Sequence, residues 1–165
     1  VLINNAAIMV HTDFTKKANL ADIENEILIN LSAPIQLCTA MLPVLREQPT
    51  AAICNVTSGL AITPISDAAV YCATKSGLRH FTRVLRYQIE DAALNITVSE
   101  AVMTLVNTSL SRGDPAKKYP PEHAADDLLA GIAAGDPHIW IERTKMLWYL
   151  FRVSPALAYR LMRGR

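Results

Sequence analysis

Short apolar runs alternate with long amphipathic stretches along this chain. Asn19 or Asp22 is placed to cap a predicted helix that runs through Leu42, because apolar residues recur there every three or four positions. The same spacing predicts a second helix from about Asp67 to Asp91. Since only a crossover helix returns a chain to a parallel neighbour, this alternation predicts an α/β fold with a doubly wound parallel sheet. The apolar runs, each short enough for a buried strand, are Val1–Ile3, Ala51–Val56 and Asn95–Val102.

The run Ile27–Leu45 carries no charge and is almost long enough to cross a membrane. Insertion would leave the polar groups of this run without water, which is costly in lipid. We therefore predict a long, largely buried helix of a soluble domain. The residues that interrupt the apolar run are Asn30, Ser32, Pro34, Gln36 and Pro43.

The turn chemistry and the C-terminal pattern complete the prediction. Thr57 to Gly59 is expected to end the second strand, because hydroxyl residues and glycine favour turns. We divide the chain into a body, residues 1–142, and an amphipathic arm, residues 143–165. The elements expected after the third strand are a polar loop at Ser109–Pro121, a helix at Glu122–Ala134, a short strand at His138–Glu142 and one or two helices within Thr144–Arg163, divided at Pro155.

Charge is balanced over the chain but not within the arm. With 16 basic and 15 acidic residues the net charge is +1, which disfavours a general nucleic-acid binder. The arm has six bases and no acid, interleaved with apolar residues, as on a helix that lies on a membrane surface or binds a partner. We favour the alternative that its apolar face covers a substrate crevice or a subunit interface. The six bases are Arg143, Lys145, Arg152, Arg160, Arg163 and Arg165.

Composition and the spacing of cysteine and histidine exclude several classes of protein. A hydrophobic content of 51% is ordinary for a globular domain and excludes a disordered chain. The odd number of cysteines, Cys38, Cys54 and Cys72, matches neither a zinc site nor a redox pair, so we expect reduced thiols in a cytoplasmic protein. The histidines share no ligand spacing either, so we expect no metal site. They are His11, His80, His123 and His138.

Tyr71 and Lys75 stand four residues apart on the second predicted helix, so both side chains project from the same face. A nearby ammonium group favours the phenolate, so Lys75 is expected to lower the pKa of Tyr71 towards neutrality. Such a phenol can exchange a proton with a substrate hydroxyl or carbonyl group. The alternative is a surface stack of the lysine stem on the ring.

Two further segments favour the catalytic interpretation of Tyr71 and Lys75 over the surface stack. Ser58 follows the second strand, and Asn4-Asn5 end the first, so both lie where parallel sheets place ligand contacts. The segment Asn4 to Ala7 resembles the Asn-Asn-Ala-Gly motif of the short-chain dehydrogenase/reductase family. Asn30, Ser58, Tyr71 and Lys75 fall at the spacings of the catalytic tetrad of that family.

The resemblance implies an NAD(P)-dependent oxidoreductase with a Rossmann-like fold, acting on a small-molecule carbonyl or alcohol. It makes Tyr71 the acid/base, Lys75 a ligand of the nicotinamide ribose that also lowers the tyrosine pKa, and Ser58 the group that polarises the substrate oxygen. Asn30 would hold a water that relays protons from Lys75 to solvent. The alternatives are a core amide for Asn30 and a turn residue for Ser58. The cofactor-binding residues implied are Asn4, Ala6, Tyr71, Lys75, Val106 and Thr108.

The downstream segments match the family less completely. Val106 and Thr108 retain a Pro-Gly-x-Val-x-Thr segment, in which the valine backbone and the threonine hydroxyl hold the nicotinamide carboxamide. Met103 and Thr104 replace its Pro-Gly pair, so the cofactor turn is expected to be altered. From Ile139 through Ala158 the chain resembles the DltE-like subgroup, which is named for D-alanine esterification of teichoic acids.

The Gly-rich phosphate loop of the family has no counterpart in this sequence. None of the six glycines makes a strand-to-helix turn able to cradle a pyrophosphate. We therefore interpret the body as the C-terminal two thirds of a family member that lacks the first strands, and its opening Val1–Ile3 as a strand already under way. We expect that this chain alone binds NAD(P) poorly, and the preference between NAD and NADP stays open.

The family resemblance also leaves a second class of function open. With an altered turn and no phosphate loop, the chain could be a non-catalytic Rossmann-like interaction or scaffold module. The resemblance further implies a homo-dimer or tetramer of the intact protein, formed through the two long helices that contain Asn30 and Tyr71.

Overall fold

Four parallel strands form a single sheet in the order β1-β2-β3-β4 in the computed structural model, which describes residues 1–163. β2 pairs with β3 along its whole length, from Ala51 opposite Ile96 to Ser58 opposite Met103. β2 continues through Thr57 and Ser58, so the expected end of this strand at these residues is wrong by two positions. The α/β fold is confirmed. The strands are β1 (Leu2–Asn4), β2 (Ala51–Ser58), β3 (Ile96–Met103) and β4 (His138–Trp140).

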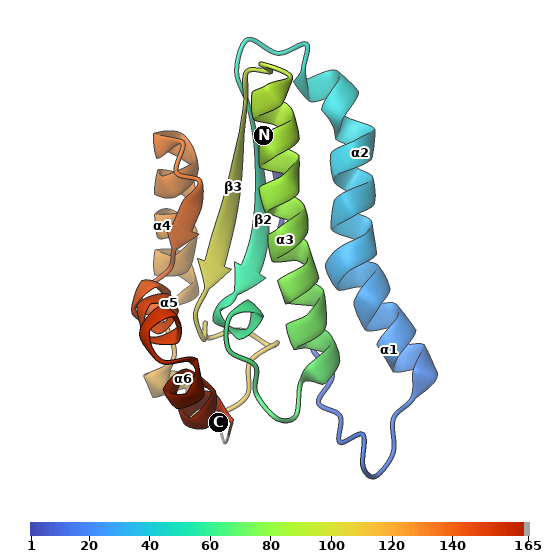
Figure 1. Ribbon diagram of the computed structural model, residues 1–165, viewed down its shortest axis with the longest axis vertical. Coiled ribbons are helices and arrows are strands. Elements are labelled where there is room, and N and C mark those ends of the chain that lie inside the picture. Colours follow the sequence, from blue (N-terminus) through green and yellow to red (C-terminus); the bar gives the residue numbers. More distant parts are fainter. Residues whose placement is uncertain (164–165) are drawn as a thin grey trace.

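Helices cover both faces of the sheet (Figure 1). Successive side chains of a strand point to opposite faces, so Ile53 of β2 packs with α2 and α3, whereas Cys54 packs with α4. The two faces thus have separate hydrophobic cores. The helices are α1 (Leu20–Ile27), the π-helical segment η1 (Leu28–Ser32), α2 (Ala33–Leu45), α3 (Ala69–Asp91) and α4 (Pro121–Ala134), with short 3-10 helices η2 (Gly59–Ala61) and η3 (Pro115–Lys117).

The first long helix is continuous but lies mostly at the surface. Asn19 caps it, and its side chain accepts a hydrogen bond from the Ala21 N–H at 3.1 Å. The segment Leu20–Leu45 is long and apolar enough to span a membrane, yet only 17% of its most apolar window is buried. The expectation of a largely buried helix is therefore wrong, because one narrow stripe faces the body. The buried residues of that stripe are Glu26, Asn30, Pro34, Cys38 and Leu45.

A buried charge network lies under α3. Glu100, near the middle of β3, is 1% exposed. Its carboxylate accepts hydrogen bonds from Thr57 Oγ1 at 2.7 Å and Arg79 Nη1 at 3.2 Å, and it pairs with His138 Nδ1 at 3.0 Å. Burial raises the pKa of this carboxyl, but the contacts of His138, Arg79 and Thr57 together lower it below its usual 4.5. These contacts join the middle of the sheet to α3 and the edge strand β4.

The arm forms two short helices, as expected, with the break at Ser154 just before Pro155. α5 (Thr144–Val153) lies beside the carboxyl end of the sheet and contacts η2, and α6 (Pro155–Met162) packs against α5 (Figure 1). A Cβ atom on Gly59, the residue after β2, would lie 3.2 Å from Leu147 Cδ2. The inner side of α5 therefore covers the turn that follows Ser58.

Candidate active site

The side chains of Ser58, Tyr71 and Lys75 converge at the carboxyl end of β2. Ser58 is the last residue of this strand, and the other two lie one turn apart at the start of α3. All three residues are buried. The Ser58 hydroxyl lies close enough to Tyr71 to lower the pKa of the phenol, and Lys75 Nζ lies 5.7 Å from the centre of the tyrosine ring. The structure thus brings together three members of the sequence-predicted tetrad and excludes the surface stack.

Local backbone contacts fix the orientation of this cluster. The Ser58 Oγ caps η2 by accepting a hydrogen bond from the Leu60 N–H at 3.1 Å. Lys75 Nζ donates to the carbonyl oxygen of Val56 at 2.9 Å, which anchors the ammonium group against β2. Because Val56 and Ser58 belong to the same strand, the sheet sets the positions of both groups beside Tyr71.

Burial controls the protonation of both ionisable groups. It raises the pKa of Tyr71 to about 12, although the Ser58 hydroxyl opposes the rise. It also lowers the pKa of Lys75 to about 8. The expectation that Lys75 lowers the tyrosine pKa towards neutrality is therefore wrong for this geometry, because loss of water dominates and Lys75 is not among the groups that shift this pKa. At neutral pH Tyr71 is a phenol and holds a proton that it can donate.

Asn30 lies in the π-helical segment and is fully buried. Its Oδ1 accepts from the Ile8 N–H at 2.9 Å, and its Nδ2 donates to the Ile8 carbonyl at 2.7 Å and to Thr74 Oγ1 at 3.4 Å. Thr74 Oγ1 in turn donates to the Tyr71 carbonyl at 2.8 Å. Asn30 therefore ties the loop after β1 to the backbone of the candidate catalytic residue, and its part in a proton relay stays a prediction.

The residues predicted to bind the cofactor at the end of β1 have different environments. Asn4 is buried, and its Nδ2 donates to Asn55 Oδ1 at 2.7 Å and contacts Cys38 Sγ at 3.4 Å. This side chain thus stabilises the core between β1, β2 and α2. Ala6, two residues later, is exposed beyond the carboxyl end of the strand. Of the two, only Ala6 presents an open surface to a ligand.

The altered turn after β3 is held partly by Ser111, Tyr119 and Glu142, which sequence reasoning did not identify. Val106 forms a bridge with Tyr119, and its carbonyl accepts hydrogen bonds from the Thr108 N–H at 2.9 Å and from Ser111 Oγ at 2.6 Å. Thr104, which replaces the family glycine, donates from Oγ1 to Glu142 Oε2 at 2.9 Å. The exposed Thr108 side chain leaves its hydroxyl open to a ligand.

Sequence reasoning also missed a histidine–aspartate pair beside the cluster of Ser58, Tyr71 and Lys75. His11 Nδ1 lies 2.7 Å from Asp67 Oδ2, and the Thr12 N–H donates to the Asp67 carbonyl at 2.8 Å. These contacts join the loop after β1 to the segment that precedes α3. The only sequence signal is the position of Asp67, four residues before Tyr71.

The cysteines and the metal-binding residue types do not form a further centre in the described part of the chain. Cys38, Cys54 and Cys72 are buried free thiols, and burial raises the pKa of each, that of Cys54 to about 12. Among residues 1–163, no group of three or more His, Cys, Asp or Glu side chains is placed to hold a metal ion.

Comparison with curated proteins identifies relatives of this chain. Residues 1–118 match the family model described as short chain dehydrogenase. The chain is 36% identical over 154 residues to the uncharacterized oxidoreductase DltE of Bacillus subtilis (strain 168), covering 89% of this chain and 60% of that protein. It is 27% identical to the ketoacyl reductase HetN of Nostoc sp. (strain PCC 7120 / SAG 25.82 / UTEX 2576), covering 99% of this chain and 61% of that protein. The chain therefore spans about 60% of the length of these relatives.

Solved structures share the fold. A short-chain dehydrogenase from Burkholderia cenocepacia J2315 in complex with NADP superposes with a TM-score of 0.87 at 21% identity, over 98% of this chain and 69% of that one. A short-chain dehydrogenase/reductase from Burkholderia phymatum in complex with NAD gives a TM-score of 0.80 at 15% identity, over 99% of this chain and 67% of that one. The match of residues 1–118 to the family model and the 36% identity to DltE show that the chain belongs to the short-chain dehydrogenase family and to its DltE-like subgroup.

Proposed function

We propose that the protein containing this chain is an NAD(P)-dependent oxidoreductase that interconverts a carbonyl group and an alcohol, with Tyr71 as the acid/base. The single observation that carries this proposal is the placement of a buried phenol between the Ser58 hydroxyl and the Lys75 ammonium group at the carboxyl end of a parallel sheet. A buried lysine is costly to a fold and needs either a partner or a function.

In the direction of reduction, the Tyr71 hydroxyl donates its proton to the substrate oxygen. Its raised pKa keeps the proton on the phenol at neutral pH, so the acid is in the correct state. Ser58 donates a hydrogen bond to the same oxygen and holds it in place. The Lys75 ammonium stabilises the phenolate that forms when the proton leaves. In oxidation, the phenolate takes the proton back from the alcohol.

The residues at one end of the site fit a nicotinamide. The Lys75 ammonium, the exposed Ala6 and the exposed Thr108 hydroxyl are the groups that would hold it, beside the backbone of Val106. When bound, this cofactor supplies or accepts the hydride that accompanies the proton transfer. Family structures in complex with NADP and with NAD support this assignment, and the preference between the two stays open.

The phosphate half of the cofactor has no glycine turn in this sequence. We therefore propose that residues 1–165 alone neither bind nor use NAD(P) with useful affinity. Isothermal titration of this chain with NADPH tests the point, and micromolar binding would contradict it without affecting the assignment of Tyr71 in the longer protein.

Replacement of the tyrosine tests the proposed function. In the full-length protein, Tyr71→Phe should reduce kcat for NAD(P)H-dependent reduction of any accepted ketone or aldehyde by about 100-fold or more, because the proton donor is lost. The phenyl ring keeps the packing, so the melting temperature should stay close to that of the parent. Full turnover by Tyr71→Phe would end the assignment.

The second candidate, a non-catalytic scaffold, is favoured by the altered turn at Met103 and Thr104. The fluorescence of bound NAD(P)H on the full-length protein separates the two, since a scaffold gives no enhancement. In either case we propose a homo-oligomer, because α2 and α3 expose the large apolar residues Leu37, Val44 and Val84. The buried reduced thiols support a cytoplasmic location.

A further inference from the structure

The two faces of the C-terminal arm have different environments. The inner side of α5 is covered: Leu147 packs on the turn at Gly59, and the Trp148 ring lies 5.7 Å from the Trp140 ring. Phe151 packs against Tyr159 of α6 with ring centres 5.6 Å apart. The favoured sequence interpretation, that the apolar face covers a substrate crevice or a subunit interface, concerns this inner side and stays a prediction.

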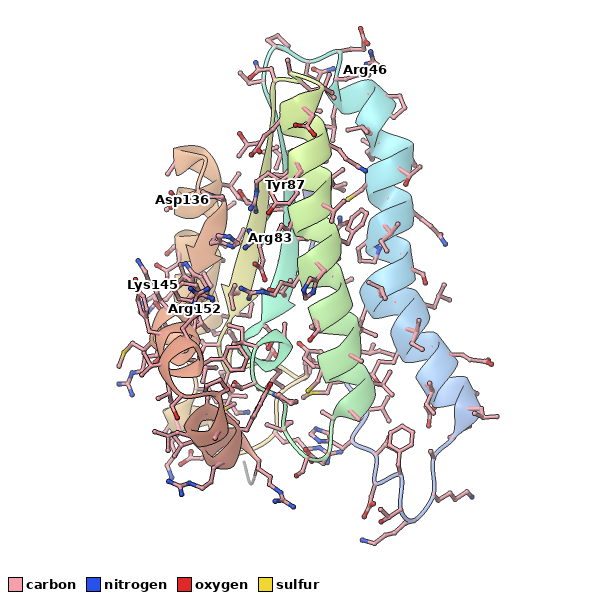
Figure 2. The ribbon with its side chains drawn as sticks, viewed as in Figure 1. Arg46, Arg83, Tyr87, Asp136, Lys145 and Arg152 are labelled. Carbon is pink, nitrogen blue, oxygen red and sulfur yellow. The ribbon has the colours of Figure 1, made fainter. Side chains whose placement is uncertain are left out.

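The outer side of α5 exposes a stripe of large apolar residues. Met146, Tyr149 and Val153 are 68%, 53% and 85% exposed, and their spacing of three and four residues places them on one line along the helix. Lys145 and Arg152 border this line and are themselves exposed. Figure 2 shows both residues at α5, and the Arg152 guanidinium lies over the Trp148 ring at 5.3 Å from its centre.

The positive charge continues onto α6. Arg160 and Arg163 are exposed there, next to the exposed Tyr159 and Leu161. Within residues 1–163, none of Lys145, Arg152, Arg160 and Arg163 forms an ion pair with an acid. The outer face of α5 and α6 thus combines unpaired cations with exposed apolar groups.

This combination distinguishes the arm from the exposed apolar face of α2. Leu37 and Val44 of α2 are about as exposed as Tyr149, but α2 contains no charged residue. An uncharged apolar face suits contact with another protein, whereas apolar side chains bordered by unpaired cations suit an anionic lipid surface. We propose that the outer face of α5 and α6 docks the protein on anionic lipid membranes without crossing them.

Vesicle co-sedimentation tests this proposal with the purified protein. Binding is expected to vesicles of about 30 mol% phosphatidylglycerol in phosphatidylcholine but not to pure phosphatidylcholine, and to fall as salt rises. Because each basic residue contributes roughly a fivefold factor to partitioning, the double variant Lys145→Glu, Arg152→Glu should lose at least 25-fold. The triple variant Met146→Ser, Tyr149→Ser, Val153→Ser should lose about tenfold or more, since apolar burial is removed.

Matched controls make the result specific to this face. The double variant Lys17→Glu, Lys117→Glu has the same change in charge at exposed positions elsewhere, and Phe14→Ser, Leu20→Ser, Leu129→Ser removes exposed apolar groups outside the arm. Both controls should bind as the parent does. Equal loss in the controls, or no preference for anionic vesicles, overturns the proposal. A third outcome also overturns the proposal: the parent protein does not bind vesicles, but the arm variants change the mass measured by light scattering. The face would then join copies of the protein.

Discussion

Lys75 Nζ lies 5.7 Å from the centre of the Tyr71 ring and donates its hydrogen bond to the Val56 carbonyl rather than to the phenol. The pair is therefore a buried cation beside a buried acid, and the strand backbone fixes the distance between them. In this environment loss of water dominates the protonation of both groups. The first two predictions follow from this relationship.

Replacing Lys75 should raise the stability of the fold and lower the activity. Lys75→Met removes a buried ammonium group and keeps an apolar stem of similar length, so the free energy of unfolding at pH 7 should increase by about 1 to 3 kcal/mol. Under the proposed function, the kcat of the full-length protein should fall by about 100-fold or more, because the phenolate loses its stabilising charge. Urea denaturation and steady-state kinetics measure the two effects. A variant that is both less stable and fully active would contradict the proposed role.

The stability of the fold should depend on alkaline pH through the same two groups. The pKa of Lys75 falls from 10.5 to about 8 on folding, so the unfolded chain binds more protons between these values and stability rises with pH. The pKa of Tyr71 rises from 10.0 to about 12, so stability falls as pH increases through that range. The three buried thiols, whose pKa values burial raises from 9.0, make stability fall above about that pH, so urea titrations between pH 7 and 11 should show the Lys75 contribution as a rise of the parent relative to Lys75→Met from about pH 8 upwards. Parallel curves for the two proteins would refute the assignment.

Asn30 should be needed for the loop after β1. Asn30→Asp keeps an acceptor for the Ile8 N–H but places a carboxylate against the Ile8 carbonyl, so we expect a loss of about 2 to 4 kcal/mol. Limited proteolysis should then cut between residues 5 and 18 faster than in the parent. Asn25→Asp, at an exposed position of α1, is the matched control and should change neither property. An Asn30→Asp protein as stable as this control would show that the contacts with Ile8 are dispensable.

The buried network of Glu100 should make the fold sensitive to acid. Because its folded pKa is below 4.5, Glu100 stabilises the fold above that value and the contribution is lost as pH falls through the folded pKa. Glu100→Gln leaves Arg79 without a counter-charge and removes a carboxylate oxygen that pairs with His138 Nδ1, and it should cost roughly 2 to 4 kcal/mol at pH 7. Below pH 4.5 its free energy of unfolding should fall less steeply with decreasing pH than that of Glu90→Gln, an exposed control on α3. Identical slopes would exclude this carboxylate as the source.

Gly131 should be required for the contact between α4 and β4. A Cβ atom at this position would lie 2.6 Å from Ile139 Cγ1 and 2.7 Å from Cγ2. Glycine to alanine within a helix normally stabilises it by up to about 1 kcal/mol, but Gly131→Ala should destabilise the fold by about 1 to 3 kcal/mol. At Gly77 the nearest atoms belong to the flexible end of Leu31 at 3.3 Å, so Gly77→Ala should stay within about 1 kcal/mol. Thermal unfolding of both variants compares the two positions, and equal melting temperatures would contradict the steric argument.

Sequence-based prediction succeeded for the backbone elements and for which residues share an end of the sheet, but not for contacts between distant side chains. The α/β order, the cap at Asn19 and the convergence of Ser58, Tyr71 and Lys75 follow from local periodicity and from the rule that parallel strands end at one edge. Glu100 was visible as a charge within an apolar strand, but its partners Arg79 and His138 come from distant segments. No local pattern specifies which distant side chains meet there.

The sequence by itself determined the order of the elements and which residues share a helix face or a strand end, because these depend on spacing along the chain. The tertiary structure alone decided how much water surrounds each group. It buried the Asn4 side chain in the core, exposed most of the helix Leu20–Leu45 and raised the pKa of Tyr71 rather than lowering it. Burial is the sum of contacts made by segments far apart in the chain, and the energy of a charge or a polar group depends on that sum.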